Sequence, residues 1–393
     1  MRLFVPRETG EARDAADGER RVALVPESVK KLVKAGVAVA VEHDEGAASF
    51  IDDGRYVEAG ATIATDPGTA LAEADLVARV RAPLPAEVEL MRPGAMLLAP
   101  LMPTRNLDLV RRLLARRVTA FSTDAIPRIS RAQAMDALSS MASIAGYKAV
   151  ILAADALPRY FPMLMTAAGT VLPAKVFVIG AGVAGLQAIA TARRLGAVVE
   201  ATDTRPAVKT EIESLGAKYV GVDTSEEAQD KGGYAKELSQ EFYRKQGELI
   251  ARHCAAADVV ITTALIGGVT APKLISAAMV EKMKPGSVIV DLAAPGGGNC
   301  ELTRPGQTVE HGGVTILAPL NLPSELASHG SLLYSRNLAA FLLAFVKEGA
   351  FSLDLTDDIL REATITHDGK VNHGPTAKAL EKSEASEKEG APR

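Results

Sequence analysis

Three closely spaced glycines are the residues of this sequence that most directly suggest chemistry. Gly180, Gly182 and Gly185 follow the apolar run 176–179 and precede a helical pattern. In such a turn the first glycine permits a tight bend, the second lets the backbone approach a pyrophosphate, and the third lets helix and strand pack closely. The N-terminus of the helix offers free N–H groups and a positive dipole end to phosphates. The segment therefore predicts a dinucleotide cradle rather than a merely structural turn.

An acidic residue follows at the spacing that such a cradle requires. Asp203 stands 18 residues after Gly185, just beyond the strand-like run 198–201. A carboxylate there hydrogen-bonds the adenosine ribose and repels the extra phosphate of NADP. Arg205 has two interpretations, because it either accommodates that phosphate or is a solvated loop residue. We favour the second, and therefore NAD as the cofactor.

The polar segment 223–240 contains Gly232 and Gly233 beside Tyr234. Long loops inside compact domains are often functional lids, so Tyr234 could close over a bound nucleotide. An ordinary surface loop has the same composition, and composition alone does not decide between the two.

Composition limits the function classes. A chain of 393 residues fits two domains, and a net charge of −4 without a basic cluster argues against nucleic-acid binding. Two cysteines suggest a reducing compartment, and the six histidines show no ligand spacing, so we expect no metal site. We expect no secretory signal at the N-terminus. Lys148 and Asp155 interrupt the apolar stretch 144–157, which is also short for a membrane span; any membrane connection should come through another polypeptide.

Alternating strand and helix patterns predict an α/β protein with two Rossmann-like, doubly wound parallel-sheet domains joined by long helices, with the nucleotide in the interdomain cleft. Strand-like runs occur first at 3–6, 37–42, 76–80, 96–99 and 118–122, and then at 176–179, 198–201, 218–220, 259–262, 288–291 and 314–317. We expect a continuous helix over about 131–157 and another over 332–347. The expected domains are 1–134 with 330–372, and the Rossmann NAD(H)-binding domain 135–329. From 373 to 393 the composition predicts a disordered tail.

Taken together, these residues resemble the NAD(H)-binding component (domain I, or alpha-1 subunit) of proton-translocating nicotinamide nucleotide transhydrogenase, a family related to alanine dehydrogenase. The similarity extends from about residue 21 to residue 367, and its most specific stretch is 127–140. Two segments depart from the family pattern. Gly267, Gly268, Val269 and Thr270 stand where the family usually has a turn with proline and arginine, and Pro295 replaces a usual acid. Both departures affect the rim of the cofactor pocket.

The resemblance implies roles for particular residues. Arg128, Gln133, Asp136 and Ser139 match the family's nicotinamide-contacting loop, Tyr234 matches its mobile-loop tyrosine, and Asp203 matches its ribose acid. From the residues alone, an Arg and an Asp near a helix start would instead form a cap and a surface ion pair. With the resemblance, Gln133 hydrogen-bonds the nicotinamide ribose or a second nucleotide, while Arg128 and Asp136 fix the ring and its carboxamide. The predicted cofactor pocket also includes Ala181, Val183, Thr204, Thr263, Ala264 and Leu265.

The first domain bears on the choice within the family. Oxidising an amino acid requires a positioned acid or base, and alanine dehydrogenases use a Lys and a His there. Arg81 stands at the position of that Lys and is a poor base, and 99–103 contains no His. Hydride transfer between two nicotinamide rings needs only close, oriented contact. Arg21 matches an arginine of the substrate-binding pattern of alanine dehydrogenases, and we interpret its role here as structural rather than substrate-binding.

The resulting hypothesis is a Re/Si-specific, proton-translocating transhydrogenase component that holds NAD(H) and is active only with its partner subunits. NADP(H) is bound on a partner domain, and membrane-spanning subunits hold the chain, itself cytoplasmic and not inserted, at the cytoplasmic face of the inner membrane. The resemblance implies a homodimer, and the apolar segment 338–346 suggests its contact. Two alternatives remain, a soluble alanine dehydrogenase-like enzyme and a non-enzymatic NAD(H) sensor.

Overall fold

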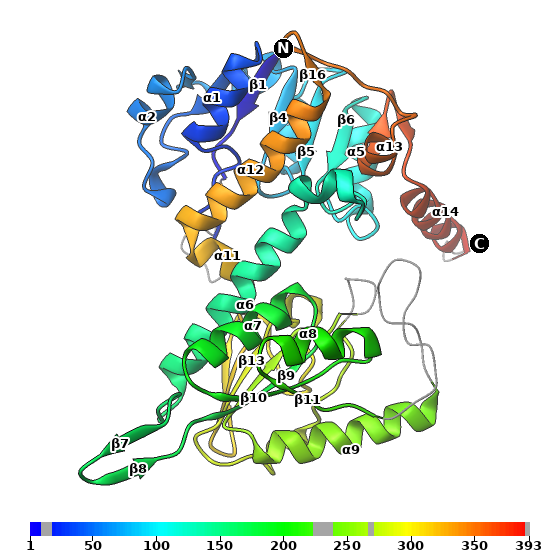
Figure 1. Cartoon of the computed structure of the whole chain (residues 1–393). Coiled ribbons are helices and arrows are strands. Elements are labelled where there is room, and N and C mark those ends of the chain that lie inside the picture. The colour runs from blue at the N-terminus through cyan, green and yellow to red at the C-terminus, as the bar shows by residue number, and fades with distance from the viewer. Residues whose placement is uncertain (9–17, 223–238, 266–270, 390–393) are drawn as a thin grey trace. The chain divides into compact units, whose positions relative to one another are not determined.

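The computed structural model describes residues 1–8, 18–222, 239–265 and 271–389. The described chain divides into two units, drawn in Figure 1. Among the described residues, the first unit contains 1–8, 19–141 and 324–389, and the second contains Gly18, 142–222, 239–265 and 271–323. The first unit is therefore assembled from two separate stretches of chain, and the division falls at 141/142 and 323/324 where the sequence suggested 134/135 and 329/330.

An eight-stranded sheet forms the centre of the first unit, in the order β19-β18-β6-β5-β4-β1-β2-β3. The strands are β1 (Arg2–Val5), β2 (Ala38–Glu42), β3 (Thr62–Ala64), β4 (Leu76–Ala78), β5 (Met96–Ala99), β6 (Thr119–Ser122), β18 (Thr364–His367) and β19 (Lys370–Val371). The first six are parallel, and β18 and β19 add an antiparallel edge. All five strands predicted here from sequence are present, and β3, β18 and β19 are additional.

Helices cover this sheet, and local sequence explains where several of them begin. They are α1 (Pro26–Lys34), α2 (Asp53–Glu58), α3 (Pro67–Glu73), α4 (Pro85–Leu90), α5 (Leu107–Ala115), α12 (Ala327–Phe345), α13 (Asp358–Ala363) and α14 (Gly374–Glu389). A proline occupies the first turn of α1, α3 and α4, where no intrahelical N–H is needed. Asp52, Asp66 and Asp357 cap α2, α3 and α13 with their carboxylates.

Helix α12 is the central core helix of this unit. Leu338, Phe341 and Leu342 are buried in the same apolar cluster as Phe121 and Tyr334. The segment 338–346 is therefore mostly core, so its apolar character is explained without a dimer contact. An apolar run of this length fits either role, and only its position on the sheet distinguishes them.

The C-terminal segment differs from the expected disordered tail. Residues 374–389 form α14, and Thr376 and Leu380 are buried against the first unit. Ala, Lys and Glu, which made the tail look disordered, are also strong helix formers. The buried Leu380, packed in the cluster of Val110 and Ile365, gives the helix a docking contact.

The second unit is built on a seven-stranded sheet in the order β11-β10-β9-β12-β13-β15-β14. Its strands are β9 (Lys175–Ile179), β10 (Val198–Thr202), β11 (Lys218–Tyr219), β12 (Val259–Thr262), β13 (Val288–Asp291), β14 (Thr308–His311) and β15 (Val314–Leu317). All pairs are parallel except β14–β15. The six predicted strands are confirmed. The helices are α7 (Val183–Arg194), α8 (Lys209–Ser214), α9 (Gln240–Ala256), α10 (Ala277–Val280) and α11 (Leu322–Glu325).

The predicted continuous helix over 131–157 is interrupted. A 3₁₀ helix, η2 (Ser130–Met135), precedes α6 (Ala137–Ala156), and Asp136 lies between them. Asp136 accepts hydrogen bonds from the backbone N–H of Ser139 (2.8 Å) and from its hydroxyl (2.6 Å). This is an N-cap interaction, so α6 starts at Ala137.

Helix α6 is, among the described helices, the one long and apolar enough to cross a membrane by length and composition. It has 20 residues, so the expectation that the apolar stretch 144–157 is too short to span a membrane does not hold for the helix that contains most of it. Core helices of soluble proteins pass the same test. Ala149, Val150 and Ala153 are buried in the core of the second unit, which explains much of the apolar character of α6.

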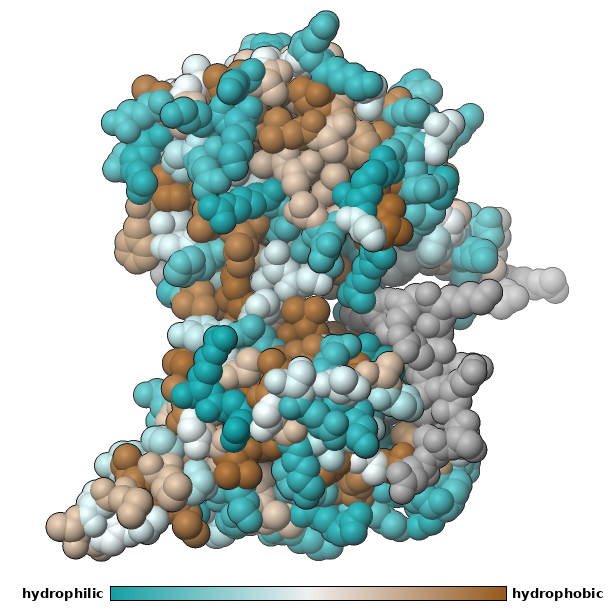
Figure 2. Space-filling model, in the orientation of Figure 1, coloured by the Kyte–Doolittle hydropathy of each residue, from teal (hydrophilic) through white to brown (hydrophobic). Residues whose placement is uncertain are grey.

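A two-stranded hairpin extends from the second unit, formed by β7 (Leu164–Thr166) and β8 (Gly169–Val171). Large apolar side chains are exposed on and beside it, including Met165 at 80% and Leu172 at 78%. Figure 2 shows brown, hydrophobic atoms on this projecting ribbon. The strand patterns of the sequence did not predict this hairpin.

Candidate functional site

The glycine turn lies where the second sheet reverses its strand order. From β9 the chain proceeds through β10 and β11 on one side, and β12 then returns to the other side of β9. Ligands of open α/β sheets bind at the carboxyl ends of strands at such a switch point. Gly180 follows β9 and Thr263 follows β12, and the Thr263 hydroxyl donates to the Gly180 carbonyl at 3.1 Å.

The protein itself requires two of the three glycines. Gly180 has φ +98°, a conformation that favours glycine, and a Cβ there would lie 2.6 Å from Thr263 Oγ1. A Cβ on Gly185 would lie 1.9 Å from the carbonyl oxygen of Gly180. These two residues therefore allow the tight turn and the close approach of α7 to β9, as predicted.

Gly182 is different. An added Cβ would meet no protein atom within 4 Å, and its φ of −74° and ψ of −169° suit any residue. The described protein thus leaves open space at this backbone, which is what close approach of a pyrophosphate to the N-terminus of α7 needs. This observation shows that the residues present fit a dinucleotide.

A further glycine fixes the start of α7 from the other side. Gly146 in α6 packs so tightly that a Cβ would lie 2.1 Å from the carbonyl oxygen of Ala184. Ser143, one turn earlier in α6, donates to Gln187 Oε1 of α7 at 3.4 Å. In the sequence Gly146 stands out only as an interruption of a helical pattern, and its contact lies too far along the chain for local spacing to indicate it.

Asp203 lies at the carboxyl end of β10 and binds the glycine turn directly. Its Oδ2 accepts the backbone N–H of Ala181 at 2.7 Å. Arg205 donates to both carboxylate oxygens, each at 3.0 Å, and its own backbone N–H adds a third bond at 2.9 Å. Arg205 is therefore not a solvated loop residue, and the hydrogen bond to Asp203 raises the pKa of its guanidinium. Thr204, between them, is half-buried.

The loop after β12 is held by an asparagine that the sequence patterns did not single out. Asn299 is fully buried; its Oδ1 accepts the N–H of Ala264 (3.0 Å), and its Nδ2 donates to the carbonyls of Ala264 and Pro272, each at 2.8 Å. Leu265 beyond it is 39% exposed, as is Val183 of the glycine turn at 42%. Nothing in the local spacing of Asn299 indicates this role.

In the second unit the structure thus brings the turn residues, Asp203, Arg205 and Thr263 together at the carboxyl ends of the central strands β9, β10 and β12. Tyr234 and the departure at 267–270 lie outside the described residues, so their roles stay predictions. Pro295 lies in a short 3₁₀ helix, η4 (Ala294–Gly296), after β13.

The predicted nicotinamide loop belongs to the first unit. Arg128 and Gln133 are exposed, while Ala132 and Met135 are buried. Arg131 pairs with Asp357 at 2.6 Å, and Asp136 caps α6 through Ser139. The cap that the residues alone suggested is therefore present, and the surface ion pair uses Arg131 and Asp357.

The first sheet has the same reversal of strand order, between β1 and β4. At this switch point the carboxylate of Glu8 binds the backbone that follows β4. Glu8 accepts hydrogen bonds from the backbone N–H groups of Val80 (2.6 Å) and Arg81 (3.2 Å) and from Arg79 Nη2 (3.4 Å). Burial raises the pKa of Glu8, although the charge of Arg79 opposes this. Arg79 also pairs with Glu87, and Arg21 is held by the two oxygens of Glu19 at 2.7 and 2.8 Å.

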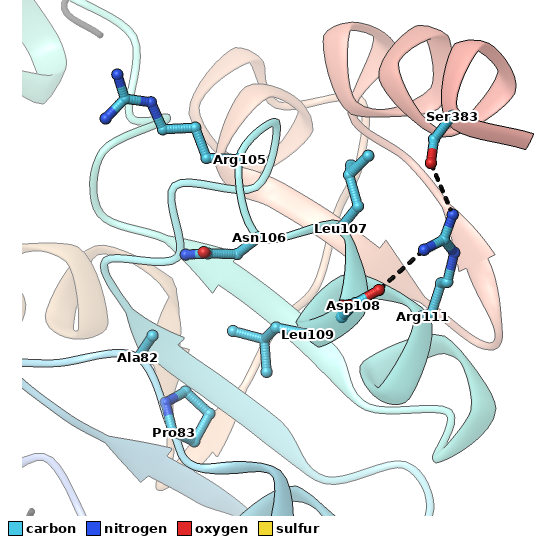
Figure 3. A pocket seen from close by; sticks show the side chains of 9 residues that line it. All are labelled: Ala82, Pro83, Arg105, Asn106, Leu107, Asp108, Leu109, Arg111 and Ser383. Atoms are coloured by element: carbon cyan, nitrogen blue, oxygen red, sulfur yellow. Dashed lines mark hydrogen bonds and ion pairs between the residues drawn. The ribbon is translucent and has the colours of Figure 1, made fainter. Parts of the chain in front are cut away.

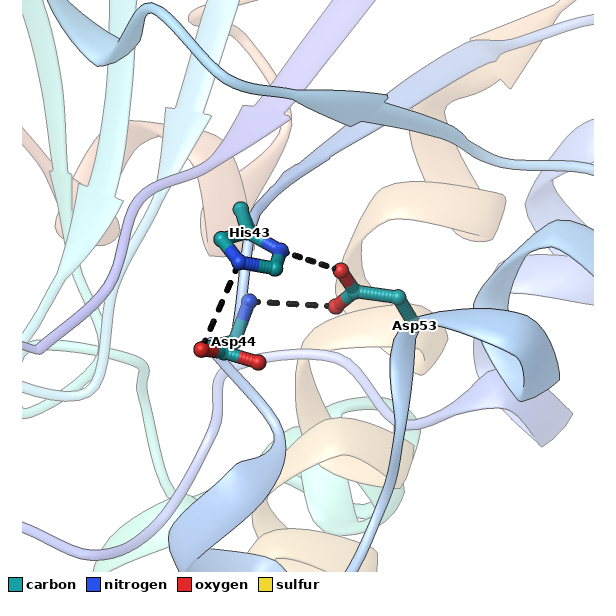
Figure 4. A group of neighbouring side chains, drawn as sticks. All are labelled: His43, Asp44 and Asp53. Carbon is teal, nitrogen blue, oxygen red and sulfur yellow. Dashed lines mark hydrogen bonds and ion pairs between the residues drawn. The ribbon is translucent and has the colours of Figure 1, made fainter.

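Two other features of the first unit lie apart from the predicted site residues. A cavity of about 460 Å³ (Figure 3) is lined by Ala82, Pro83, Arg105, Asn106, Leu107, Asp108, Leu109, Arg111 and Ser383. His43, Asp44 and Asp53 form an exposed group (Figure 4), in which His43 Nδ1 lies 2.6 Å from Asp53 and Nε2 lies 3.4 Å from Asp44. The hydrogen bond to Asp53 raises the pKa of His43. The two ring nitrogens face different carboxylates, an ion-pair arrangement.

Two Rossmann-type units, one with a glycine turn and a ribose-type acid, define a dinucleotide-binding protein. Residues 5–145 match the family model for the alanine dehydrogenase/PNT N-terminal domain, and residues 149–374 match that for the C-terminal domain. The chain belongs to the alanine dehydrogenase/PNT family.

Individual relatives indicate the branch. The chain is 47% identical over 382 residues to an alpha-subunit component of the NAD(P) transhydrogenase of Rhodospirillum rubrum, covering 95% of this chain and 98% of the relative. A transhydrogenase crystal structure from Sinorhizobium meliloti is 44% identical, with a TM-score of 0.85 and coverage of 94% and 100%. An L-alanine dehydrogenase structure is 27% identical, with a TM-score of 0.82 and coverage of 97% and 99%. These relatives support an NAD-binding component of NAD(P) transhydrogenase, and they confirm the α/β fold and the family resemblance.

Proposed function

We propose that the chain holds NADH at the glycine turn and passes hydride directly to NADP⁺ bound on a partner domain of a proton-translocating transhydrogenase. The supporting observation is the dinucleotide cradle, together with Arg81 at the position in the first unit where alanine dehydrogenases carry a lysine. There, the backbone of Arg81 is bound by Glu8, and an arginine stays protonated. Moving a hydride between two nicotinamides requires orientation and exclusion of water but no proton abstraction.

In this proposal the residues of the second unit bind and orient the cofactor. The backbone of Gly180, Ala181, Gly182, Val183 and Gly185 forms the pyrophosphate cradle. Asp203 receives the ribose hydroxyls, and Arg205, already bonded to Asp203, balances the charge of that carboxylate. Thr204, Thr263, Ala264 and Leu265 form the rim, and Asn299 fixes Ala264. The bound nicotinamide supplies the hydride chemistry.

The loop of the first unit orients the reacting ring. Gln133 and Arg128 are both exposed at the surface of this unit. Asp136 already accepts two hydrogen bonds from Ser139. We therefore assign Asp136 and Ser139 a share in fixing the loop as well as the predicted contact to the ring.

We infer that the partners are an NADP(H)-binding domain and membrane-spanning subunits, which place the chain at the cytoplasmic face of the inner membrane. We also infer a homodimer, now through the β7–β8 hairpin rather than 338–346. Met165 and Leu172 expose most of their surface to solvent, and exposed apolar groups of this kind mark protein contacts.

The dimer inference is tested by sedimentation of a variant carrying Met165→Ser and Leu172→Ser. We expect the wild type to sediment as a dimer and this variant as a monomer. Val57→Ser, which removes another exposed apolar residue, is the control and should leave the dimer intact. A dimer that persists in the hairpin variant would refute the inference.

The main test mixes the purified chain, NADH and an NADP-binding partner domain carrying an oxidised NADP analogue. Transfer to the analogue supports the proposal. NADH binding without transfer refutes it, and nucleotide-dependent binding to the partner without transfer would favour a sensor. Steady NADH oxidation with pyruvate and ammonia, without any partner, would favour an amino-acid dehydrogenase.

A further inference from the structure

The segment that carries Gln133 changes helix type although the sequence pattern continues. In η2 the N–H of Ala132 bonds to the carbonyl of Ile129 (2.9 Å), and the N–H of Asp136 bonds to that of Gln133 (3.4 Å). With three residues per turn, Ala132 and Met135 share the buried side and Gln133 is exposed. Runs of 3₁₀ helix longer than three or four residues are uncommon, so a specific contact is expected to hold these six.

Asn337 of α12 makes such a contact. Its Nδ2 donates to the carbonyl oxygen of Ala134 at 2.9 Å. In an uninterrupted α-helix the same oxygen would accept the N–H of Leu138, four residues later. The side-chain amide therefore holds toward α12 the carbonyl oxygen that α6 would need along its own axis in order to extend backwards through Ala134.

Stability alone does not explain an asparagine at this position. Asn337 is 8% exposed, and its Oδ1 is buried with no hydrogen-bond partner among the described residues. A buried acceptor left unsatisfied costs about 1–3 kcal/mol. A leucine of similar size would avoid the unsatisfied Oδ1, but it would leave the carbonyl oxygen of Ala134 without the hydrogen bond from Asn337. The residue type is explained by what the amide does to Ala134.

We propose that Asn337 is a positioning residue that keeps α6 from extending into η2 and so holds Gln133 on the exposed side. The consequence for activity rests on the proposed function, in which Gln133 contacts the reacting nucleotides. Successive residues turn by about 100° in an α-helix and by about 120° in a 3₁₀ helix, a difference of about 20° per step. Position 133 lies three steps before 136, so conversion of this segment to α-helix rotates Gln133 about the helix axis by about 60°. Misplacement by about 1 Å can reduce a rate about a hundredfold.

The test compares Asn337→Leu and Asn337→Val, which both remove the donor and place an uncharged, apolar side chain at this buried position. We expect hydride transfer at saturating NADH to fall about tenfold to a hundredfold with NADH affinity unchanged. We also expect amide hydrogen exchange at Leu138 to slow, because its N–H gains the carbonyl of Ala134. The control, Asn106→Leu, removes an equivalent amide-to-carbonyl bond, from Asn106 Nδ2 to Leu101 O (2.7 Å), and should keep the transfer rate.

The outcomes separate this inference from the proposed function. If the wild type transfers no hydride, the proposed function fails, and exchange at Leu138 still decides whether Asn337 interrupts the helix. Normal transfer and unchanged exchange in both Asn337 variants would overturn the inference. A parallel loss of NADH affinity, or equal losses of transfer in Asn106→Leu, would also overturn it, because a general structural role would then suffice.

Discussion

Replacing Gly182 by alanine should separate nucleotide binding from folding. A Cβ at this position meets no protein atom within 4 Å. Alanine is a poorer N-cap than glycine by up to about 1 kcal/mol, but it restricts the unfolded chain by about 0.4–1 kcal/mol. These two effects nearly offset each other. We therefore expect the free energy of unfolding to change by less than about 1 kcal/mol.

Binding should respond strongly to the same change. If a pyrophosphate approaches the backbone at Gly182, the added methyl group occupies its place. We expect the Kd for NADH to rise at least about tenfold, which corresponds to about 1.4 kcal/mol. Calorimetric titration measures the affinity, and thermal unfolding without nucleotide measures the stability.

Two other glycines serve as matched controls. In Gly185→Ala the Cβ would lie 1.9 Å from the Gly180 carbonyl, which Thr263 also binds. Overpacking costs about 1–3 kcal/mol and sometimes more, so we expect about 3 kcal/mol and a Tm lower by about 6–12 °C. Gly247→Ala, in α9 with no atom within 4 Å, should stabilise the chain and leave binding unchanged. Wild-type NADH affinity in Gly182→Ala would refute the assignment of the cradle.

Three further predictions concern charged groups. Asp203→Asn should weaken NADH binding and lower the preference for NADH over NADPH, because the carboxylate charge is lost while Arg205 remains. A ratio of NADPH to NADH Kd values equal to that of the wild type, measured by titration, would contradict this. Asp136→Asn should keep the cap and the Tm, whereas Asp136→Ala should lower the Tm by removing the cap. Both variants should slow hydride transfer if the carboxylate touches the nicotinamide ring. Unchanged transfer in Asp136→Asn would show that Asp136 only caps α6. Arg131 lowers the pKa of Asp357, so this pair stabilises the fold above the unfolded pKa of about 3.9, and the contribution is lost as pH falls through the lower folded pKa. Asp357→Asn should therefore be less stable than wild type at pH 7 by at most about 1 kcal/mol, with a difference that disappears in acid denaturation experiments; a pH-independent difference would contradict the ion pair.

The sequence predicted what depends on local spacing. The glycine turn, Asp203 and the strands around them follow from residues that are close along the chain, and the structure places them at one sheet edge. The capping of α6 by Asp136 was also readable, because Asp136 and Ser139 are three residues apart.

Long-range contacts account for what the sequence did not predict. Asn337 and Ala134 are 203 residues apart, so the hydrogen bond that joins η2 to α12 could not be inferred from a helical pattern. Glu8 and Val80 are 72 residues apart, which concealed the contact of Glu8 at the switch point of the first unit. Composition also did not predict two features in the C-terminal part of the first unit. The apolar run 338–346 is mostly core, and the charged segment 374–389 forms helix α14.

Hydride transfer in the reconstituted pair tests the central claim most directly. The chain would be given NADH deuterated at the transferring position, together with a partner domain that carries an oxidised NADP analogue. We predict that deuterium appears in the reduced analogue without loss to water, and that transfer stops when the partner is omitted. Tight NADH binding with no deuterium in the analogue would contradict it.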